Sequence, residues 1–310
     1  MEVREDRRKS NRQVGLIICL FAYLVAGVMA WLVYDAVSIF HPILVVLILD
    51  ITATLVVFLF SVLFNNSSIY DPYWSVVPPI ILLYWVFHEQ TLAALTLMQI
   101  LILSMVGFWS LRLTLNWITR WRGIKDEDWR YIAFRFKFQG QYWVVSLAGI
   151  HLFPTIVVFL ACLPVYPALV MHEGIMGMME WIAVGVTLAG ILFETIADWQ
   201  LRNYERKKTN CDFQNAGLWK YSRHPNYFGE VLFWVGLFLF STGMDKAYWW
   251  ILPGPVLMIL MFYQISIPMI DKRMLRRRTG YRDYMKRTSA MIPLPPRKPV
   301  ESSFTILKSS

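Results

Sequence analysis

The chain has 310 residues, of which 57% are hydrophobic, and its formal net charge is +9. A water-soluble core does not need so many long apolar runs, so the composition excludes an ordinary soluble domain and predicts a membrane protein that crosses the bilayer several times. The positive charge does not indicate a nucleic-acid partner, because Lys and Arg cluster between the apolar runs, where topology and anionic lipid headgroups account for most of them.

Eight apolar segments are candidate membrane spans, which predicts an all-α bundle of about seven to eight transmembrane helices. They cover residues 14–34, 42–64, 76–87, 92–113, 142–165, 178–198, 226–242 and 248–270. The third and seventh are short enough to be re-entrant or buried instead. We divide the chain into four parts. They are a polar arm (1–13), an N-terminal transmembrane half with a basic loop (14–140), a C-terminal transmembrane catalytic half (141–298) and a mobile tail (299–310).

The basic residues lie near the N-terminus and in residues 112–137, 202–223 and 272–298. The positive-inside rule places these segments, and both termini, on the cytoplasmic side, which requires an even number of spans. The first apolar run is long and lacks a cleavage pattern, so it is interpreted as a signal anchor. These features favour the endoplasmic reticulum, and a bacterial inner membrane fits the same physics.

The segment GLWKYSRHPNYFGE, residues 217–230, joins a basic loop to an apolar helix. Pro225 suits a first helical turn, so Arg223 and His224 precede the helix. Asn226 and Glu230 then lie four residues apart on its first turns. Acidic groups at the depth of Glu230 are costly and usually functional. A basic anchor at the membrane edge explains Arg223 alone and leaves the rest of the segment unexplained.

This segment resembles the C-terminal domain shared by steroid 5α-reductases, sterol C14- and Δ7-reductases and isoprenylcysteine methyltransferases. Within that superfamily the chain is most similar to the DUF1295 family, whose three sequence patterns match residues 193–200, 218–230 and 281–293. The similarity is strong over about residues 180–295. It implies that the RHPNY element binds the cofactor, through Tyr221, Arg223, His224 and Asn226 here.

A row of Glu194, Asp198 and Arg202, four residues apart, lies on one face of the expected helix over residues 178–198 and its continuation. Two carboxylates followed by an arginine can hold the ribose, amide and phosphate groups of a nucleotide. The resemblance implies cofactor contacts on this helix. The alternative is a structural ion pair between Asp198 and Arg202 at the membrane interface.

A second row, Arg112, Asn116 and Arg120, has the same spacing at the end of the fourth span. Guanidinium groups suit phosphate oxygens because they donate hydrogen bonds in pairs. The family resemblance suggests that this region completes a pyrophosphate clamp. Lys207 and Lys208 are placed to meet a 2′-phosphate, which favours NADPH as the cofactor.

Reduction of a carbon–carbon double bond conjugated to a ketone needs hydride at the β-carbon and a hydrogen-bond donor at the enolate oxygen. The 5α-reductases use a Glu and a Tyr from the N-terminal half, and the candidates here are Asp71 and Tyr73 in IYDPYWS. An Asp-Pro turn also explains Asp71. Asp50, inside the second span, needs a partner, and His151 is more typical of a satisfied core histidine than of a ligand.

We therefore expect a membrane-embedded NADPH-dependent reductase of a carbon–carbon double bond in a steroid- or isoprenoid-like substrate that enters from the bilayer. The expected catalytic residues are Glu230, Tyr227, Asp71 and Tyr73. The sequence has no Rossmann or P-loop motif and no metal-ligand spacing, so a dinucleotide must be held by the ends of membrane helices, and no metal site is expected.

Two other functions stay open. One is an S-adenosylmethionine-dependent methyltransferase of an isoprenylcysteine or lipid substrate. Those enzymes carry adjacent glutamates after the last span, whereas this chain has Asp271 followed by Lys272. The other is a non-enzymatic lipid-binding protein. The presence of both Asn226 and Glu230 argues against it.

Overall fold

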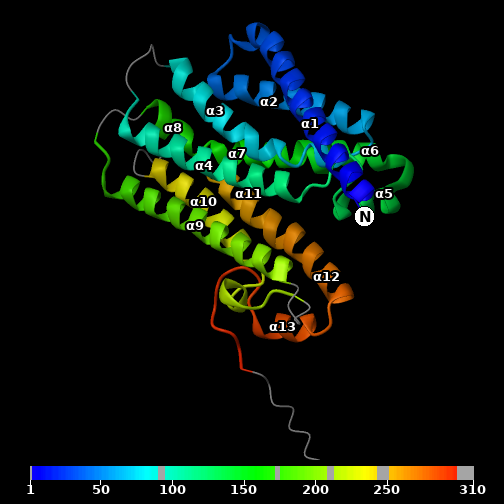
Figure 1. Cartoon of the computed structure of the whole chain (residues 1–310). Coiled ribbons are helices and arrows are strands. Elements are labelled where there is room, and N and C mark those ends of the chain that lie inside the picture. Colours follow the sequence, from blue (N-terminus) through cyan, green and yellow to red (C-terminus); the bar gives the residue numbers. More distant parts are fainter. Residues whose placement is uncertain (1, 90–94, 172–174, 208–212, 243–250, 299–310) are drawn as a thin grey trace, which may run out of the picture. The chain divides into compact units, whose positions relative to one another are not determined.

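The computed structural model describes residues 2–89, 95–171, 175–207, 213–242 and 251–298, and these residues form helices and connecting turns without a β-strand (Figure 1). The predicted all-α fold is confirmed. The α-helices are α1 (Glu2–Val37), α2 (Pro42–Leu63), α3 (Tyr73–Glu89), α4 (Leu97–Arg120), α5 (Trp129–Phe138), α6 (Tyr142–Val145), α7 (Phe153–Cys162), α8 (Val165–Val170), α9 (Met178–Lys207), α10 (Pro225–Thr242), α11 (Pro253–Met261), α12 (Ile267–Arg277) and α13 (Tyr281–Arg287). Two π-helical segments, Ser146–Leu152 and Phe262–Ser266, continue α6 into α7 and α11 into α12.

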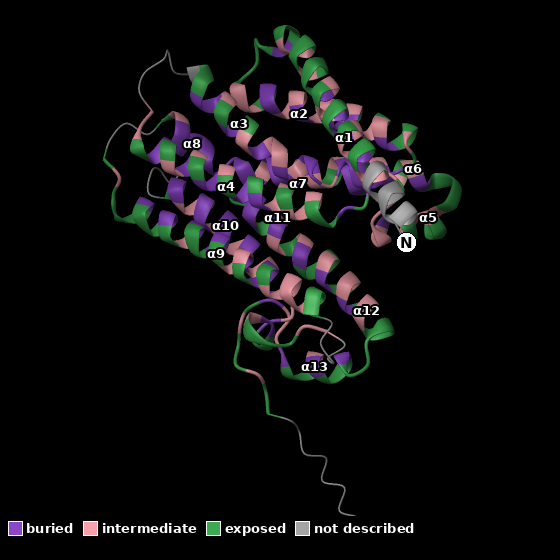
Figure 2. Cartoon of the chain, viewed as in Figure 1, coloured by how far each residue is buried: buried purple, intermediate pink, exposed green. Residues whose placement is uncertain are grey.

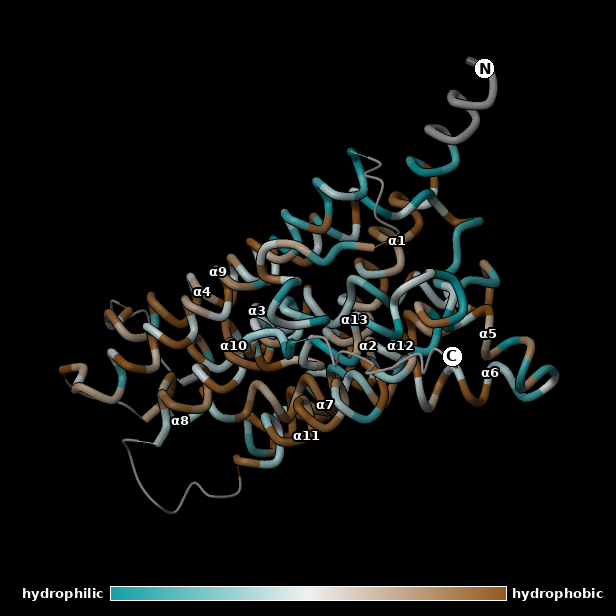
Figure 3. The backbone as a smooth tube through the Cα atoms, turned by 90° about the horizontal axis from the view of Figure 1, so that it is seen from below, coloured by the Kyte–Doolittle hydropathy of each residue, from teal (hydrophilic) through white to brown (hydrophobic). Residues whose placement is uncertain are grey.

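Within the described residues, six continuous helical segments are long and apolar enough to cross a membrane. They are Asn11–Val37, Pro42–Leu63, Leu97–Arg120, Trp129–Cys162, Met178–Lys207 and Pro253–Arg277. Figure 3 shows the hydrophobic character of this set, with α7 and α11 mostly brown. The protein is therefore an integral membrane protein. The predicted count of seven to eight is not confirmed, because the two short candidates, α3 and α10, fall outside the six.

The chain forms two compact units by its internal contacts. The first unit comprises Met1–Thr187 and Trp234–Met258, and the second comprises Leu188–Phe233 and Ile259–Ser310. The boundaries pass through α9, α10 and α11. This division follows contacts, whereas the predicted division at residue 140 follows sequence motifs, so the two do not coincide.

In the first unit α1 packs on α2 through small side chains. Cys19, Ala22 and Ala26 of α1 are buried together with Val57 of α2. The polar residues before position 14 continue α1 as helix. Arg12 fixes this end of the helix, because its guanidinium donates a 2.6 Å hydrogen bond to the carbonyl of Ile118.

In the second unit α9 and α10 approach each other through two glycines. A Cβ on Gly229 would lie 2.5 Å from Cγ of Glu194, and one on Gly190 would lie 2.7 Å from the carbonyl oxygen of Gly229. No side chain fits at this contact, so the helix backbones lie close together. Figure 2 shows α10 as buried or intermediate over most of its length. The two helices that bear the predicted carboxylates are therefore neighbours.

Candidate functional site

The loop before α10 folds back onto the end of α9. Gly217 has φ +65°, a conformation that favours glycine, and a Cβ there would meet the side chain of Gln200 at 2.5 Å. The Gln200 side chain accepts a 2.9 Å hydrogen bond from the amide of Leu218. The Trp219 indole donates to the carbonyl of Ala197 at 3.1 Å. These contacts attach the start of the motif to the helix that carries Glu194 and Asp198.

The segment after α13 lies along the centre of the motif. The amide of Arg223 donates to the carbonyl of Ser289 at 2.9 Å, and Ser222 Oγ donates to the carbonyl of Met291 at 2.7 Å. The amide of Leu294 donates to the carbonyl of Tyr221 at 3.0 Å. Two of the three sequence patterns on which the resemblance rests, residues 218–230 and 281–293, therefore form one structural element.

Asp271 of α12 binds the two basic side chains of the motif. Arg223 Nη2 donates to Asp271 Oδ2 at 2.8 Å, and His224 Nε2 lies 3.1 Å from Asp271 Oδ1. The Tyr281 hydroxyl donates to the same Oδ1 at 2.6 Å. Burial, and then the Asp271 carboxylate, raise the pKa of Tyr281 above its ordinary value, so this phenol stays a neutral donor.

Arg223 therefore has protein partners for most of its guanidinium. Besides Asp271, its Nη1 donates to the carbonyls of Thr288 at 2.7 Å and Met285 at 3.3 Å. Only its buried Nε has no hydrogen-bond partner within the described residues. Sequence reasoning assigned Arg223 to the cofactor and did not include Asp271 in the site. The sequence contains one indication that Asp271 belongs to the site: it is a lone acid between an apolar run and a basic segment.

The predicted carboxylates of α9 and α10 are buried. Glu194 and Glu230 are each 3% exposed and Asp198 is 9% exposed. Glu194 lies against Gly229, the residue before Glu230, so the structure brings these two acids to the same helix contact. Arg202 continues the α9 row as a half-buried side chain.

The first turns of α10 place an aromatic stack beside these acids. The Tyr227 ring is stacked against His224, with 5.4 Å between the ring centres, and against Phe262 at 4.6 Å. Asn226 is half-buried and Tyr221 is exposed. The second unit thus contains every predicted site residue of α9, the motif and α10.

The remaining predicted residues belong to the first unit. Arg112 of α4 is buried, Asn116 is half-buried and Arg120 is exposed, so the row changes from buried to exposed toward the end of α4. Its role in phosphate binding stays a prediction. Lys208 lies outside the described residues, and Lys207 is the exposed last residue of α9.

Asp71 and Tyr73 do not pair with each other. The Tyr73 hydroxyl donates to Asp50 Oδ1 at 2.8 Å, which supplies the partner that Asp50 needs. Asp71 Oδ1 accepts a 2.5 Å hydrogen bond from the Tyr131 hydroxyl. Burial, and then the nearby Asp128, raise the pKa of Asp71 to about 7. The predicted pair is thus two separate acid–phenol pairs, and Asp50 belongs to one of them.

His151 is a satisfied core histidine. Its Nδ1 lies 2.9 Å from the carbonyl of Ser146, and its Nε2 lies 3.0 Å from Ser61 Oγ. Its side chain is fully buried. Among the described residues, no three His, Cys, Asp or Glu side chains form a group that could hold a metal ion.

The fold and the buried acids define a multi-pass membrane protein with a polar site in its second unit. A family model described as "Protein of unknown function (DUF1295)" matches residues 57–288, and the chain belongs to this family. The family is related to the steroid 5α-reductase-like superfamily.

An uncharacterized protein of Schizosaccharomyces pombe is 28% identical over 230 residues. The alignment covers 65% of this chain and 65% of that relative, just under two thirds of the relative's length. No solved structure matches the chain.

Proposed function

We propose that the protein is a membrane-embedded, NADPH-dependent reductase of an activated carbon–carbon double bond in a lipophilic substrate. The observation that supports this most directly is the pair of buried acids, Glu194 and Glu230, at the contact between α9 and α10. Carboxylates are rare at such positions in membrane helices unless they bind something. The ribose hydroxyls and the carboxamide of a nicotinamide nucleotide can donate hydrogen bonds to such carboxylates.

The neighbouring side chains fit the same ligand. The Tyr227 ring is stacked against His224 and Phe262, and these contacts fix the position of the aromatic side chains beside the acids. Asp271 fixes the position of His224. When bound, NADPH supplies the hydride for the β-carbon of the double bond. The protein's part is to bind the cofactor, exclude water and orient the donor groups.

Substrate activation needs a hydrogen-bond donor at the carbonyl oxygen. In the first unit Tyr73 was predicted for this role, but its hydroxyl donates to Asp50 Oδ1 at 2.8 Å, so the role stays a prediction. Asp71 is held by Tyr131 instead. Asp50, rather than Asp71, is therefore the acid that is paired with Tyr73.

Asp271 favours the reductase over the methyltransferase. It occupies the place where isoprenylcysteine methyltransferases have adjacent glutamates, and its carboxylate is bound by Arg223, His224 and Tyr281. The next residue, Lys272, is exposed and basic. Asp271 is therefore not followed by a second acid, and the absence of the glutamate pair supports NADPH rather than S-adenosylmethionine as the ligand.

The test is ligand binding to detergent-purified protein, with NADPH, NADH and S-adenosylmethionine as ligands. We expect NADPH to bind, and we expect Glu194→Gln and Glu230→Gln each to weaken its binding by at least about tenfold, or about 1.4 kcal/mol. The control is Glu205→Gln, an exposed position further along α9. Binding of S-adenosylmethionine without NADPH binding would show that the reductase assignment is wrong.

Melting of the unliganded variants separates the site from the scaffold. If Glu194 and Glu230 serve mainly a ligand, their neutral variants should melt close to the parent protein. If they hold helices together, truncation should cost about 1–3 kcal/mol of unfolding free energy with no change in affinity. That second result would show that Glu194 and Glu230 are structural and that the ligand site has been misplaced.

A further inference from the structure

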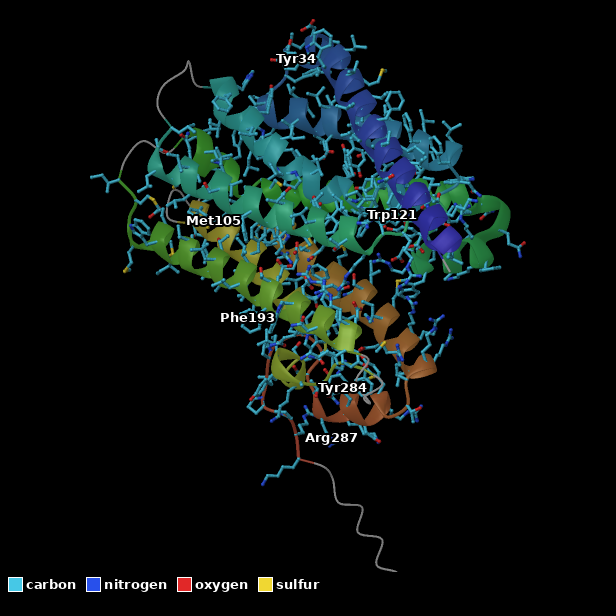
Figure 4. All side chains as sticks on the ribbon, in the orientation of Figure 1. Tyr34, Met105, Trp121, Phe193, Tyr284 and Arg287 are labelled. Carbon is cyan, nitrogen blue, oxygen red and sulfur yellow. The ribbon has the colours of Figure 1, made fainter. Side chains whose placement is uncertain are left out.

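A cavity of about 260 Å³ lies in the second unit, next to the motif. Its described lining comes from the loop before the motif, from the motif itself and from α13 and the segment after it. Figure 4 labels two of the lining residues, Tyr284 and Arg287, both on α13. Sites for drug-sized ligands have volumes of about 300–1,000 Å³. This cavity therefore suits one end of a larger ligand.

The cavity is basic. Lys220 and Arg287 line it, and none of the described lining residues is acidic. Neither cation forms an ion pair within the described part of the chain, although Arg287 Nε donates to the carbonyl of Asp283 at 3.4 Å. The neighbouring acid, Asp283, pairs with Lys286 at 3.2 Å. Two cations without a carboxylate between them attract an anion.

Aromatic rings form another wall. Phe213 and Tyr284 both line the cavity, and their ring centres are 5.1 Å apart. The Tyr284 hydroxyl is occupied, because it donates to the carbonyl of Trp219. What the wall offers a ligand is therefore ring surface, on which a nucleobase can stack.

The cavity is built on the motif. Thr288 lines it, and the carbonyl of Thr288 accepts the 2.7 Å hydrogen bond from Arg223. Tyr281, which binds Asp271, packs edge-on against Phe213 with 5.3 Å between ring centres. The amide of Arg297 donates to the carbonyl of Arg287 at 2.9 Å, which fixes the last described segment across α13. The walls are thus held by the same contacts that position Arg223 and His224.

We propose that this cavity binds the phosphorylated adenosine end of NADPH, with Lys220 and Arg287 on the 2′-phosphate and the adenine against Phe213 and Tyr284. The proposal rests on the proposed function and names the part of the protein that distinguishes NADPH from NADH. It replaces Lys207 and Lys208 as the expected contacts of the 2′-phosphate.

The experiment compares the parent protein with the double variant Lys220→Gln/Arg287→Gln. Lys286→Gln is the matched control, because Lys286 is an exposed cation on the same helix that pairs with Asp283 and does not line the cavity. Calorimetry measures binding of NADPH, NADH and adenosine 2′,5′-bisphosphate, and melting checks the fold. We expect the double variant to bind NADPH and the bisphosphate at least about tenfold more weakly, with NADH affinity and melting unchanged.

The outcomes separate this proposal from the function. If the parent protein prefers NADPH to NADH and the double variant keeps that preference, the cavity assignment is overturned and the reductase stands. If the parent binds the bisphosphate through these two residues but binds neither dinucleotide, the cavity assignment stands and the reductase assignment fails.

The phosphate of an anionic lipid is the other ligand that could bind these two cations. Native mass spectrometry that shows phosphatidic acid retained through Lys220 and Arg287, with no binding of the bisphosphate, overturns the nucleotide assignment.

Discussion

Two aspartates, the buried Asp271 of the second unit and the half-buried Asp71 of the first, show how the surroundings of a carboxyl group decide its role. Asp271 in the second unit is bound by a guanidinium, an imidazole and a phenol, which suits a charged carboxylate. Asp71 in the first unit has the Tyr131 hydroxyl as a close donor and lies near Asp128. Asp271 holds the motif together, whereas the charge of Asp71 depends on pH. Sequence position alone does not distinguish them.

The largest expected effect is at Asp271. Asp271→Ala leaves the Arg223 side chain, which is only 10% exposed, without its carboxylate, so we expect the unfolding free energy to fall by about 3–5 kcal/mol. The measurement is thermal or denaturant unfolding in detergent. Asp283→Ala is the control, because the Asp283 side chain is 63% exposed, and it should change stability by less than about 0.5 kcal/mol. If the Asp271→Ala protein unfolds like the parent, the structural role assigned to Asp271 is contradicted.

The two phenols give an intermediate effect that sharpens the comparison. Tyr281→Phe removes a hydrogen bond to a charged acceptor, which costs about 1.5–3 kcal/mol. Tyr131→Phe removes a hydrogen bond to Asp71, which at pH 6 is mostly a neutral acceptor, so we expect about 0.5–1.5 kcal/mol. Unfolding of both variants at pH 6 measures the difference. Equal losses, or a larger loss at Tyr131, would contradict the distinction between the two aspartates.

The smallest effect is a pH dependence at Asp71. Because its pKa rises from 3.8 to about 7 on folding, the folded protein binds more protons than the unfolded chain between these values. This contribution to stability is complete below about pH 4 and is lost as the pH rises through about 7. From pH 6 to 7.5 we expect a loss of about 1 kcal/mol, which Asp71→Asn should abolish. Melting temperature against pH gives the slope, and an unchanged slope in the variant would exclude Asp71 as its source.

The membrane fold follows from the sequence because the bilayer imposes a length and a composition on each span. The long runs, such as α1 and α2, meet both conditions within one continuous segment. The number of spans depends on α3 and α10, which have 17 and 18 residues. A helix of that length is compatible with a span or with a buried helix, so composition alone does not decide.

The site was predictable where it is local. Spacings of four residues place Glu194 with Asp198 and Asn226 with Glu230, and the motif predicts the start of α10 at Pro225. Pairings between distant residues were not predictable. Arg223 and Asp271 are 48 residues apart, and Asp71 and Tyr131 are 60 apart. No helical period relates such positions, so only the fold shows that Asp271 belongs to the motif.

The pairing of the motif with the segment after α13 has a consequence for biosynthesis. Ser222 and Met291 are joined by a hydrogen bond across 69 residues of sequence, and α10, α11, α12 and α13 lie between them in the sequence. A ribosome synthesizes the chain from its N-terminus, so these helices emerge before residues 289–294 can pair with the motif. The RHPNY element is therefore completed late in synthesis, and a chain interrupted after α12 would have its membrane helices but no finished motif.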